Sequence, residues 1–401
     1  MSRKPSPGST VCWSGYWRVA EKGRPRILHL HSGFNLGGKE ARAVRLMNIW
    51  GNRLHHTVVS ADHDAMGAAK AISGDVPCDF PKKAAPSLHG MPGLRRYREW
   101  ARYMQEFDLV LTYNWGAMDA VMAHRIFSPF MHLPPLIHHE DGFNEDEAHR
   151  LKAKRNIFRR LALGSAHALV VPSRNLDRIA QDIWRRPERQ VQLIFNGIDV
   201  DAYARQPASD AIPGFHRAEG KLVVGTLAGL RAVKNLPRLV RVLTPFKDRV
   251  QLVIVGEGPE RESIEQQAHA VGFDALCMPG FLPDPWKYIG LFDIFALSSD
   301  SEQFPISLVE AMAAGLPAVS TDVGDVRNMV AKSNVPFVVP VTDEQAIADA
   351  FSSLIADPAL RHTIGQDNRE RARSDYCEAD MVARYAALYG SAMGRPHILT
   401  P

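Results

Sequence analysis

The chain has little cysteine, and its four cysteines follow neither a metal-binding nor a disulfide spacing. They stand far apart, without a C-x-x-C pair, at Cys12, Cys78, Cys277 and Cys377. Such a distribution argues against a zinc site and against a disulfide framework, and it fits a reducing compartment. The sequence therefore predicts a cytoplasmic protein without structural zinc or disulfides.

Long apolar runs are missing as well. No stretch approaches about 18 apolar residues in succession, so we expect no transmembrane helix. Residues 1–25 are basic and rich in proline and glycine, and they lack the apolar segment of a signal peptide. We interpret this stretch as a flexible lead-in to the first domain.

Neither sign of charge is in large excess. The 48 Lys and Arg residues are set against 44 Asp and Glu residues, which leaves a formal net charge of +4. A charge of this size does not indicate a nucleic-acid partner. No internal repeat or long low-complexity tract interrupts the chain, and its 401 residues correspond to two or three domains.

What the sequence does contain is strands that end in glycine-rich loops and continue as helices. Residues 26–31 predict a strand, a loop with Gly37 and Gly38 follows, and 39–49 predict a helix. This order brings backbone N–H groups close to a ligand phosphate or sugar. Similar segments return after a polar, proline-containing linker at 205–216. The alternation is typical of α/β proteins.

The most informative stretch is 299–326, which we interpret as loop, helix, turn and strand. Ser301 is placed to cap the helix, Pro305 fits its first turn, and Gly315 fits a left-handed position after its end. The N-terminus of such a helix carries free N–H groups and a positive dipole end, which favour a phosphate.

Two carboxylates, Glu302 and Glu310, flank the start of this helix, with seven residues between them. Their backbones should be roughly 12 Å apart, whereas two acids that act on one glycosidic bond stand about 5 to 9.5 Å apart. They instead suit two ends of one elongated ligand, where each carboxylate accepts hydrogen bonds from hydroxyl groups. A sugar, a diphosphate and a ribose in a row would match this arrangement.

This block, from Glu302-Gln-Phe-Pro to Glu310-Ala-Met-Ala-Ala-Gly-Leu-Pro, resembles the donor site of the retaining GT-B glycosyltransferases of family 4, also called group 1. The resemblance extends over roughly residues 26–392 and is strongest in the second half. Its other marks are the glycine loop followed by Glu40, the Asn-Gly-Ile-Asp turn at 196–199 and the Gly-x-Gly-Pro turn at 256–259. The last turn does not form a nicotinamide fingerprint, because Arg261 stands at the third glycine position.

The resemblance implies an α/β fold with two Rossmann-like domains that face each other across a cleft. A C-terminal helix would cross back to the first domain. We expect an acceptor-side domain at 1–203, a nucleotide-sugar-binding domain at 204–378, and the returning helix with a tail at 379–401.

The resemblance also implies which residues hold the donor. Glu310 would bind ribose hydroxyls, and Glu302 would orient the sugar together with N–H groups of the following loop. The donor-binding residues that match the family are Gly37, Gly38, Gly258, Phe304, Pro305, Ile306 and Glu310.

Four residues are candidates for catalysis, namely His139, Glu302, Lys234 and Arg231. Lys234 or Arg231 would neutralise the donor diphosphate as the glycosidic bond breaks. The sequence departs from the family here, because Gly229 stands where an arginine is usual, five residues before Lys234.

A strand that ends near residue 139 carries histidines and acids to the edge of the sheet, where α/β proteins bind ligands. The resemblance places a histidine here, close to the transferred sugar and the acceptor, and His139 is preferred over His138. Glu140 or Asp141 could orient or deprotonate an acceptor hydroxyl, although a solvated turn explains these acids as well.

The predicted function is the retaining transfer of a sugar from a UDP- or GDP-sugar to a glycan or lipid-linked acceptor. It would serve cell-surface polysaccharide or glycoconjugate biosynthesis, and the resemblance implies that no metal or cofactor is required. The alternatives are a nucleotide-sugar epimerase and a catalytically silent nucleotide-sugar-binding protein. A basic amphipathic helix expected at 147–162 is either a solvated face or a peripheral contact to the inner face of the membrane.

Overall fold

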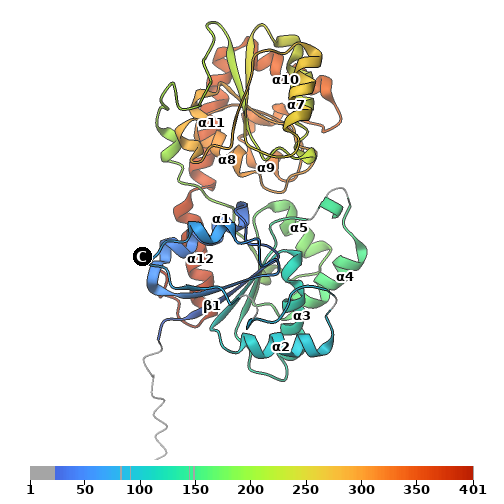
Figure 1. Ribbon diagram of the computed structural model, residues 1–401, viewed down its shortest axis with the longest axis vertical. Helices are drawn as coiled ribbons and strands as arrows, with labels where there is room; N and C mark the ends of the chain where they lie inside the picture. Colours follow the sequence, from blue (N-terminus) through green and yellow to red (C-terminus); the bar gives the residue numbers. More distant parts are fainter. Residues whose placement is uncertain (1–22, 82–83, 91, 144, 148–149, 401) are drawn as a thin grey trace, which may run out of the picture.

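A computed structural model of the chain describes residues 23–81, 84–90, 92–143, 145–147 and 150–400. The expected lead-in at 1–25 and Cys12 lie almost entirely outside the described residues. Two α/β units follow one another along the long axis of the molecule (Figure 1). Each consists of a parallel sheet with the helices that cover it, and we call them the first and the second layer. The last helix lies among elements of the first layer.

The first layer is built on a seven-stranded parallel sheet with the order β3-β2-β1-β4-β5-β6-β7. Its five inner strands are mostly buried on both faces, as expected of a parallel sheet covered by helices, whereas the two edge strands are partly exposed. The strands are β1 Arg26–His31, β2 His55–Ser60, β3 Cys78–Asp79, β4 Leu109–Tyr113, β5 Leu136–His139, β6 Ala168–Val171 and β7 Val191–Leu193. The helices are α1 Gly38–Trp50, α2 Leu94–Met104, α3 Met118–Phe127, α4 Ala153–Ala162 and α5 Arg174–Asp182.

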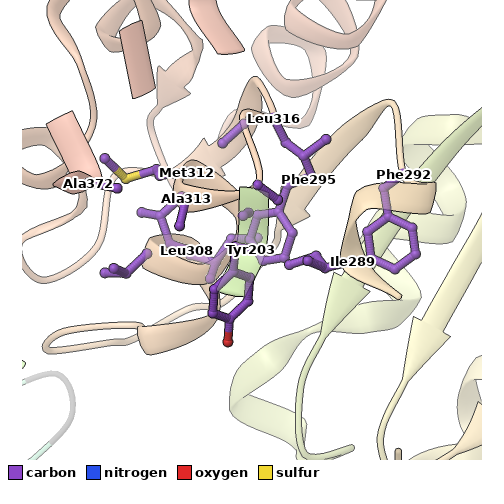
Figure 2. Close-up of a cluster of buried hydrophobic side chains, with 14 of the residues drawn as sticks. Tyr203, Ile289, Phe292, Phe295, Leu308, Met312, Ala313, Leu316 and Ala372 are labelled. Atoms are coloured by element: carbon purple, nitrogen blue, oxygen red, sulfur yellow. The ribbon is translucent and has the colours of Figure 1, made fainter. Parts of the chain in front are cut away.

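The second layer has a six-stranded parallel sheet with the order β10-β9-β8-β11-β12-β13. An apolar cluster fills the space between this sheet and α8 (Figure 2). The strands are β8 Leu222–Leu227, β9 Val250–Val255, β10 Leu276–Gly280, β11 Ile294–Leu297, β12 Ala318–Thr321 and β13 Val338–Val339. The helices are α6 Leu236–Leu243, α7 Arg261–Val271, α8 Ile306–Ala313, α9 Val326–Met329, α10 Glu344–Ala356 and α11 Pro358–Asp375. The last helix, α12 Glu378–Ala392, follows α11 and returns to the first layer.

The strand order explains where ligands bind. In the first sheet the chain winds outward in opposite directions from β1 and β4, and in the second sheet from β8 and β11. Loops at the carboxyl ends of such strand pairs diverge and leave a crevice between them. The loops in question carry Gly37 after β1, Asn114 after β4, Lys234 after β8 and Glu302 after β11.

The last helix, α12, completes the core of the first layer. Met381, Tyr385 and Tyr389 pack in one cluster with β1 residue Ile27 and with Trp50 of α1. The predicted fold class, with two Rossmann-like layers and a C-terminal helix that returns to the first, is therefore confirmed.

The two crossings of the chain between the layers are tied together. Ile198, in the Asn-Gly-Ile-Asp turn, forms a parallel β-bridge with Cys377, and its N–H donates to the Tyr376 carbonyl at 2.9 Å. A Cβ at Gly197 would come within 2.7 Å of the Cys377 carbonyl oxygen. Asn196 and Gly197 are both residue types that can take positive φ, but neither does so in this turn. Close approach of the two crossings is what requires glycine.

Two local expectations are wrong. The helix expected at 147–162 begins only at Ala153, because a short 3-10 turn occupies Glu145–Glu147. Ser301 does not cap α8; the cap position is Pro305, which makes no side-chain hydrogen bond. Gly315 does take a left-handed conformation after the helix, with φ of 79°. Among the described residues, no helix combines the length and the apolarity needed to cross a bilayer.

Candidate functional site between the two sheets

Two adjoining cavities lie between the layers and form one continuous cleft. Both are lined by Gly38, Asn196 and Ile306, so they meet at the N-terminus of α8. The cavity of about 430 Å³ contains Glu302, and the cavity of about 490 Å³ contains Glu310. The two acids singled out from the sequence therefore lie in different compartments of the same cleft.

Helix α8 starts where the cavities meet. Ile306 is its first residue, and Pro305 before it has no N–H group. The first backbone N–H groups of a helix have no intrahelical acceptor, and the helix dipole adds positive potential at that end. An anionic group of a ligand would be stabilised here, between the two carboxylates.

The glycine loop approaches α8 closely from the opposite wall. A Cβ on Gly38 would lie 3.4 Å from the terminal methyl carbon of Ile306, and Gly37 also lines the cavity of Glu302. Next in the chain, Lys39 and Glu40 form an ion pair at the cavity wall. Small residues at 37 and 38 thus leave space beside the N-terminus of α8.

Lys234 and Glu302 form an ion pair with each other. Lys234 ends a 3-10 turn at Ala232–Lys234 after β8, and Glu302 lies in the loop after β11. The Ser299 hydroxyl also donates to Oε1 of Glu302 at 2.8 Å. An anionic ligand would therefore compete with Glu302 for the lysine, or share it.

Arg231 lines the same cavity and is exposed. In the part of the chain that the structure describes, it makes no ion pair, so its charge is available to a ligand. Gly229 has no positive φ, and a Cβ there would meet its nearest neighbours only at 3.8 and 3.9 Å. The backbone at 229 would thus accept an arginine, and the guanidinium that lines this cavity is that of Arg231, two residues further on.

Glu310 is held at the wall of the larger cavity. Tyr203 donates its hydroxyl hydrogen to Oε1 of Glu310 at a distance of 3.0 Å. Burial raises the pKa of Glu310 to about 7, and the hydrogen bond from Tyr203 opposes this rise by favouring the charged form.

His139 does not reach the cleft. Its side chain is buried, Nδ1 lies 3.2 Å from the Thr112 carbonyl oxygen, and Nε2 lies 2.7 Å from the Tyr389 hydroxyl. Burial, and then the charge of Arg42, hold the pKa of His139 well below its ordinary value, so the ring is neutral. His138 is buried too, and its Nδ1 bonds the Thr112 hydroxyl at 2.8 Å. Both histidines serve the interior of the first layer.

Of the two acids that follow this strand, Asp141 lines the cavity. Its carboxylate is bound by the Arg42 guanidinium at 2.9 Å, and its N–H donates to the side-chain oxygen of Asn114 at 2.7 Å. Glu140 is buried instead and pairs with Arg159 at 3.2 Å. The acidic group available at this edge of the first sheet is thus Asp141.

The remaining donor-site candidates divide between the cleft and the packing around it. Phe304 lines the cavity of Glu302, and Pro305 is buried at the start of α8. Gly258 lines neither cavity; it has φ of 155°, and a Cβ there would lie 2.4 Å from the Leu230 carbonyl oxygen. It supports the loop that precedes Arg231.

Several lining residues were not singled out from the sequence. They are Asn114, Gln303, Tyr203 and Trp286. Asn114 could have been found from its position directly after a buried strand. Tyr203 and Trp286 could not, because the path of the connecting segments alone brings them to the cavity.

Comparisons with known proteins place both layers. The sequence model named "Glycosyl transferases group 1" matches residues 209–371, and the model named "Glycosyltransferase Family 4" matches residues 36–202. Together the two models match most of the chain.

Curated relatives are similar at low identity. The chain is 24% identical over 207 residues to N-acetyl-alpha-D-glucosaminyl L-malate synthase of Bacillus anthracis. The aligned region covers 51% of this chain and 54% of that protein. It is 28% identical over 322 residues to the putative glycosyltransferase EpsF of Bacillus subtilis, which covers 74% and 79%. The chain thus spans about half the length of the first of these relatives.

Solved structures share the fold over nearly the whole chain. A structure of Anabaena Alr3699/HepE in complex with UDP has a TM-score of 0.74 at 20% identity and covers 91% of this chain and 100% of that one. A glycosyltransferase from Rickettsia africae ESF-5 has a TM-score of 0.74 at 12% identity, with 93% and 99% covered. At these identities the likeness establishes the fold.

Proposed function

We propose a function on the premise that this chain belongs to the group 1 glycosyltransferases of family 4. It transfers a sugar from a nucleotide-diphosphate donor to a glycan or lipid-linked acceptor, with retention at the anomeric carbon, in the synthesis of cell-surface polysaccharide or glycoconjugate. The observation that carries the proposal is that Glu302 and Glu310 lie in two cavities joined at the N-terminus of α8. That order of groups suits sugar, diphosphate and ribose.

Each part of the donor has a matching wall of the cleft. The diphosphate would lie against the first turn of α8, with Arg231 and Lys234 beside it. The ribose would bind Glu310, and the sugar would bind Glu302. The solved relative HepE binds UDP and UDP-glucose, which supports UDP as the first nucleotide to test; GDP is the second.

Positively charged groups of this chain would stabilise the leaving group. When the bond between the anomeric carbon and the donor phosphate oxygen breaks, negative charge develops on the diphosphate. The helix end, Lys234 and Arg231 stabilise it. We propose attack from the same face, in which the acceptor oxygen bonds the anomeric carbon and its proton passes to the leaving phosphate oxygen.

This arrangement requires no metal and no cofactor beyond the nucleotide-sugar itself. Lys234 and Arg231 replace the divalent cation that other phosphate sites use, since both line the cavity. We therefore expect transferase activity to be unchanged after treatment with EDTA, when the ionic strength of the buffer is kept constant. A loss that Mg²⁺ or Mn²⁺ reverses would contradict this part of the proposal.

The acceptor would enter on the side of the first layer, past Asp141. A relative from Campylobacter jejuni is named for an undecaprenyl-diphosphate acceptor, and this supports testing lipid-linked acceptors. Peripheral membrane contact would use the exposed side of α4, where Ile157 is 60% and Leu161 59% exposed beside Lys154 and Arg160.

That surface is smaller than the sequence suggests. Arg155 pairs with Asp146 and Glu147, and Arg159 is fully buried in ion pairs with Glu140 and Glu147. Only part of the basic side of α4 is therefore free to meet anionic lipid. Co-sedimentation with vesicles of phosphatidylglycerol and phosphatidylcholine, compared for the wild type and Ile157→Asp, would test the contact.

The function is tested by incubating the protein with UDP- and GDP-sugars and candidate acceptors and identifying products by mass spectrometry. The Glu302→Gln and Lys234→Ala proteins serve as comparison. A new glycosidic product that is lost in both variants supports the proposal. Near-normal turnover in both variants would end it. So would conversion of UDP-N-acetylglucosamine without an acceptor, or tight nucleotide binding without any transfer or donor hydrolysis.

A further inference from the structure

Tyr203 belongs to the segment that connects the two sheets, yet its hydroxyl group is part of the cleft. It lies in a 3-10 turn at Ala202–Ala204, between the last strand of the first sheet and the first strand of the second. Its ring packs in the apolar cluster beneath α8, with Leu308 and Ile289. Figure 2 shows its hydroxyl oxygen pointing away from that cluster.

The hydroxyl of Tyr203 makes a hydrogen bond to one side chain, that of Glu310. It donates to Oε1 of Glu310 at 3.0 Å, and both residues line the larger cavity. A carboxylate accepts on both oxygens. With Oε1 held by the tyrosine, Oε2 is the atom left to a hydroxyl group of a ligand. The apolar packing of the ring keeps this geometry fixed.

Other ionisable groups face the same cavity, but none of them bonds Glu310. Asp199, Arg45 and Glu378 come from the first layer and the crossings, Asp284 from the loop after β10, and Arg45 pairs with Glu378 at 2.7 Å. Tyr288 lies nearby and donates to the Leu282 carbonyl at 3.1 Å. Tyr203 is therefore the side chain that sets the orientation of Glu310 among the described residues.

We propose that Tyr203 is a positioning residue that holds Glu310 as a one-sided acceptor for a ribose hydroxyl, and that it thereby makes the cleft select ribonucleotide over 2′-deoxyribonucleotide donors. The inference rests on the proposed function, since it assigns the ribose to Glu310. Without the tyrosine hydroxyl, Glu310 could turn within the cavity. The loss of a ribose hydroxyl from the nucleotide would then reduce its binding affinity by a smaller factor.

The test measures dissociation constants of UDP and 2′-deoxyUDP, with GDP and 2′-deoxyGDP as a second pair, by isothermal titration calorimetry. The wild type should prefer the ribonucleotide by about tenfold or more, the scale of a hydrogen bond to a charged group. In Tyr203→Phe this preference should fall by about three- to tenfold. The donor KM should rise while kcat at saturating donor stays close to that of the wild type.

Tyr376→Phe is the matched control. Tyr376 lies in the same apolar cluster and donates to the Met329 carbonyl at 3.2 Å, but it lines neither cavity. The Tyr376→Phe variant loses a buried hydroxyl group, as Tyr203→Phe does. Its preference for the ribonucleotide should stay at the wild-type value. An equal fall in both variants would show a general packing effect and overturn the inference.

A double-mutant cycle keeps the inference testable even if Tyr203→Phe is less stable. If Tyr203 acts through Glu310, then Tyr203→Phe should change the preference little in a Glu310→Gln background, with the folded fraction of each variant measured by circular dichroism. Additive effects would contradict the inference. Failure of the function itself gives a different result: either neither UDP nor GDP binds the wild type, or the nucleotides bind and no sugar is transferred in the product assay.

Discussion

The two walls of the cleft use their polar residues in opposite ways. On the second layer, Lys234, Arg231 and Glu302 come from loops at the strand ends and line the cavity. On the first layer, the histidines at the strand ends turn inward and bond the interior. The first wall also brings Lys39, Glu40 and Asp141 to the cavity, but its strand-end histidines are used for interior packing.

The difference teaches that a polar residue at a strand end is not by itself a site residue. His139 ends the buried strand β5 and Lys234 lies in the loop after β8, but α12 returns to the first layer and covers His139 through Tyr389. Among the described residues no helix covers Lys234 in this way, and its side chain lines the cavity. The predictions below test this contrast, from the largest expected effect to the smallest.

Loss of Lys234 should have the largest effect. Lys234→Ala removes a cation from the cavity and leaves Glu302 unpaired, so kcat/KM for the donor should fall by about 100- to 1,000-fold. Steady-state kinetics against Lys332→Ala, an exposed lysine on the same layer, measure the difference. If the two variants have comparable kcat/KM, then Lys234 and its charge do not contribute to catalysis.

Arg231 and Gly229 allow the charged wall to be rebuilt. Arg231→Ala should lower kcat/KM by about 10- to 100-fold, because the diphosphate loses one cation. Gly229→Arg in that background should recover part of the loss, since a Cβ at 229 has only ordinary contacts. If the double variant is no better than Arg231→Ala, the guanidinium is needed at its own position.

The first wall can be divided by comparing Asp141 with His139. Asp141→Asn should lower kcat/KM for the acceptor by about tenfold, because its carboxylate lines the cavity. His139→Phe should leave the kinetics of the folded protein nearly unchanged but lower the free energy of unfolding by about 1–3 kcal/mol, since the Tyr389 hydroxyl loses its partner. Urea denaturation measures the second effect, and a kinetic loss in His139→Phe without a stability loss would reverse the assignment.

Glu310 gives the smallest effect, and it depends on pH. Its pKa is raised to about 7 by burial, so the carboxyl group takes up a proton as the pH falls through 7. The ionised form accepts ribose hydroxyls better, so kcat/KM for the donor should fall by several-fold from pH 8 to pH 6. Glu310→Gln should lack this step. A flat profile in the wild type would separate Glu310 from donor binding.

The second layer was predictable because its site is local in sequence. Glu302, Pro305, Ile306 and Glu310 lie within one loop and helix, so spacing along the helix was enough to place both acids around its N-terminus. The two-layer fold followed from the strand and glycine-loop pattern together with the family resemblance.

The first layer was less predictable because its site depends on distant contacts. Whether His139 or Asp141 faces the cleft is decided by α12, some 250 residues further along the chain, whose Tyr389 hydroxyl bonds His139. Tyr203 reaches Glu310 across 107 positions. No periodicity or local motif carries such information.

The position of α12 has a consequence for how the protein is made. The first sheet is complete at Leu193, but the helix that covers one of its faces starts only at Glu378. At a ribosomal rate of about 5–20 residues per second, that face waits roughly 10 to 40 s for its partner. During synthesis the apolar side chains that α12 covers, such as Ile27 of β1 and Trp50 of α1, therefore lack this cover until the last part of the chain has been made.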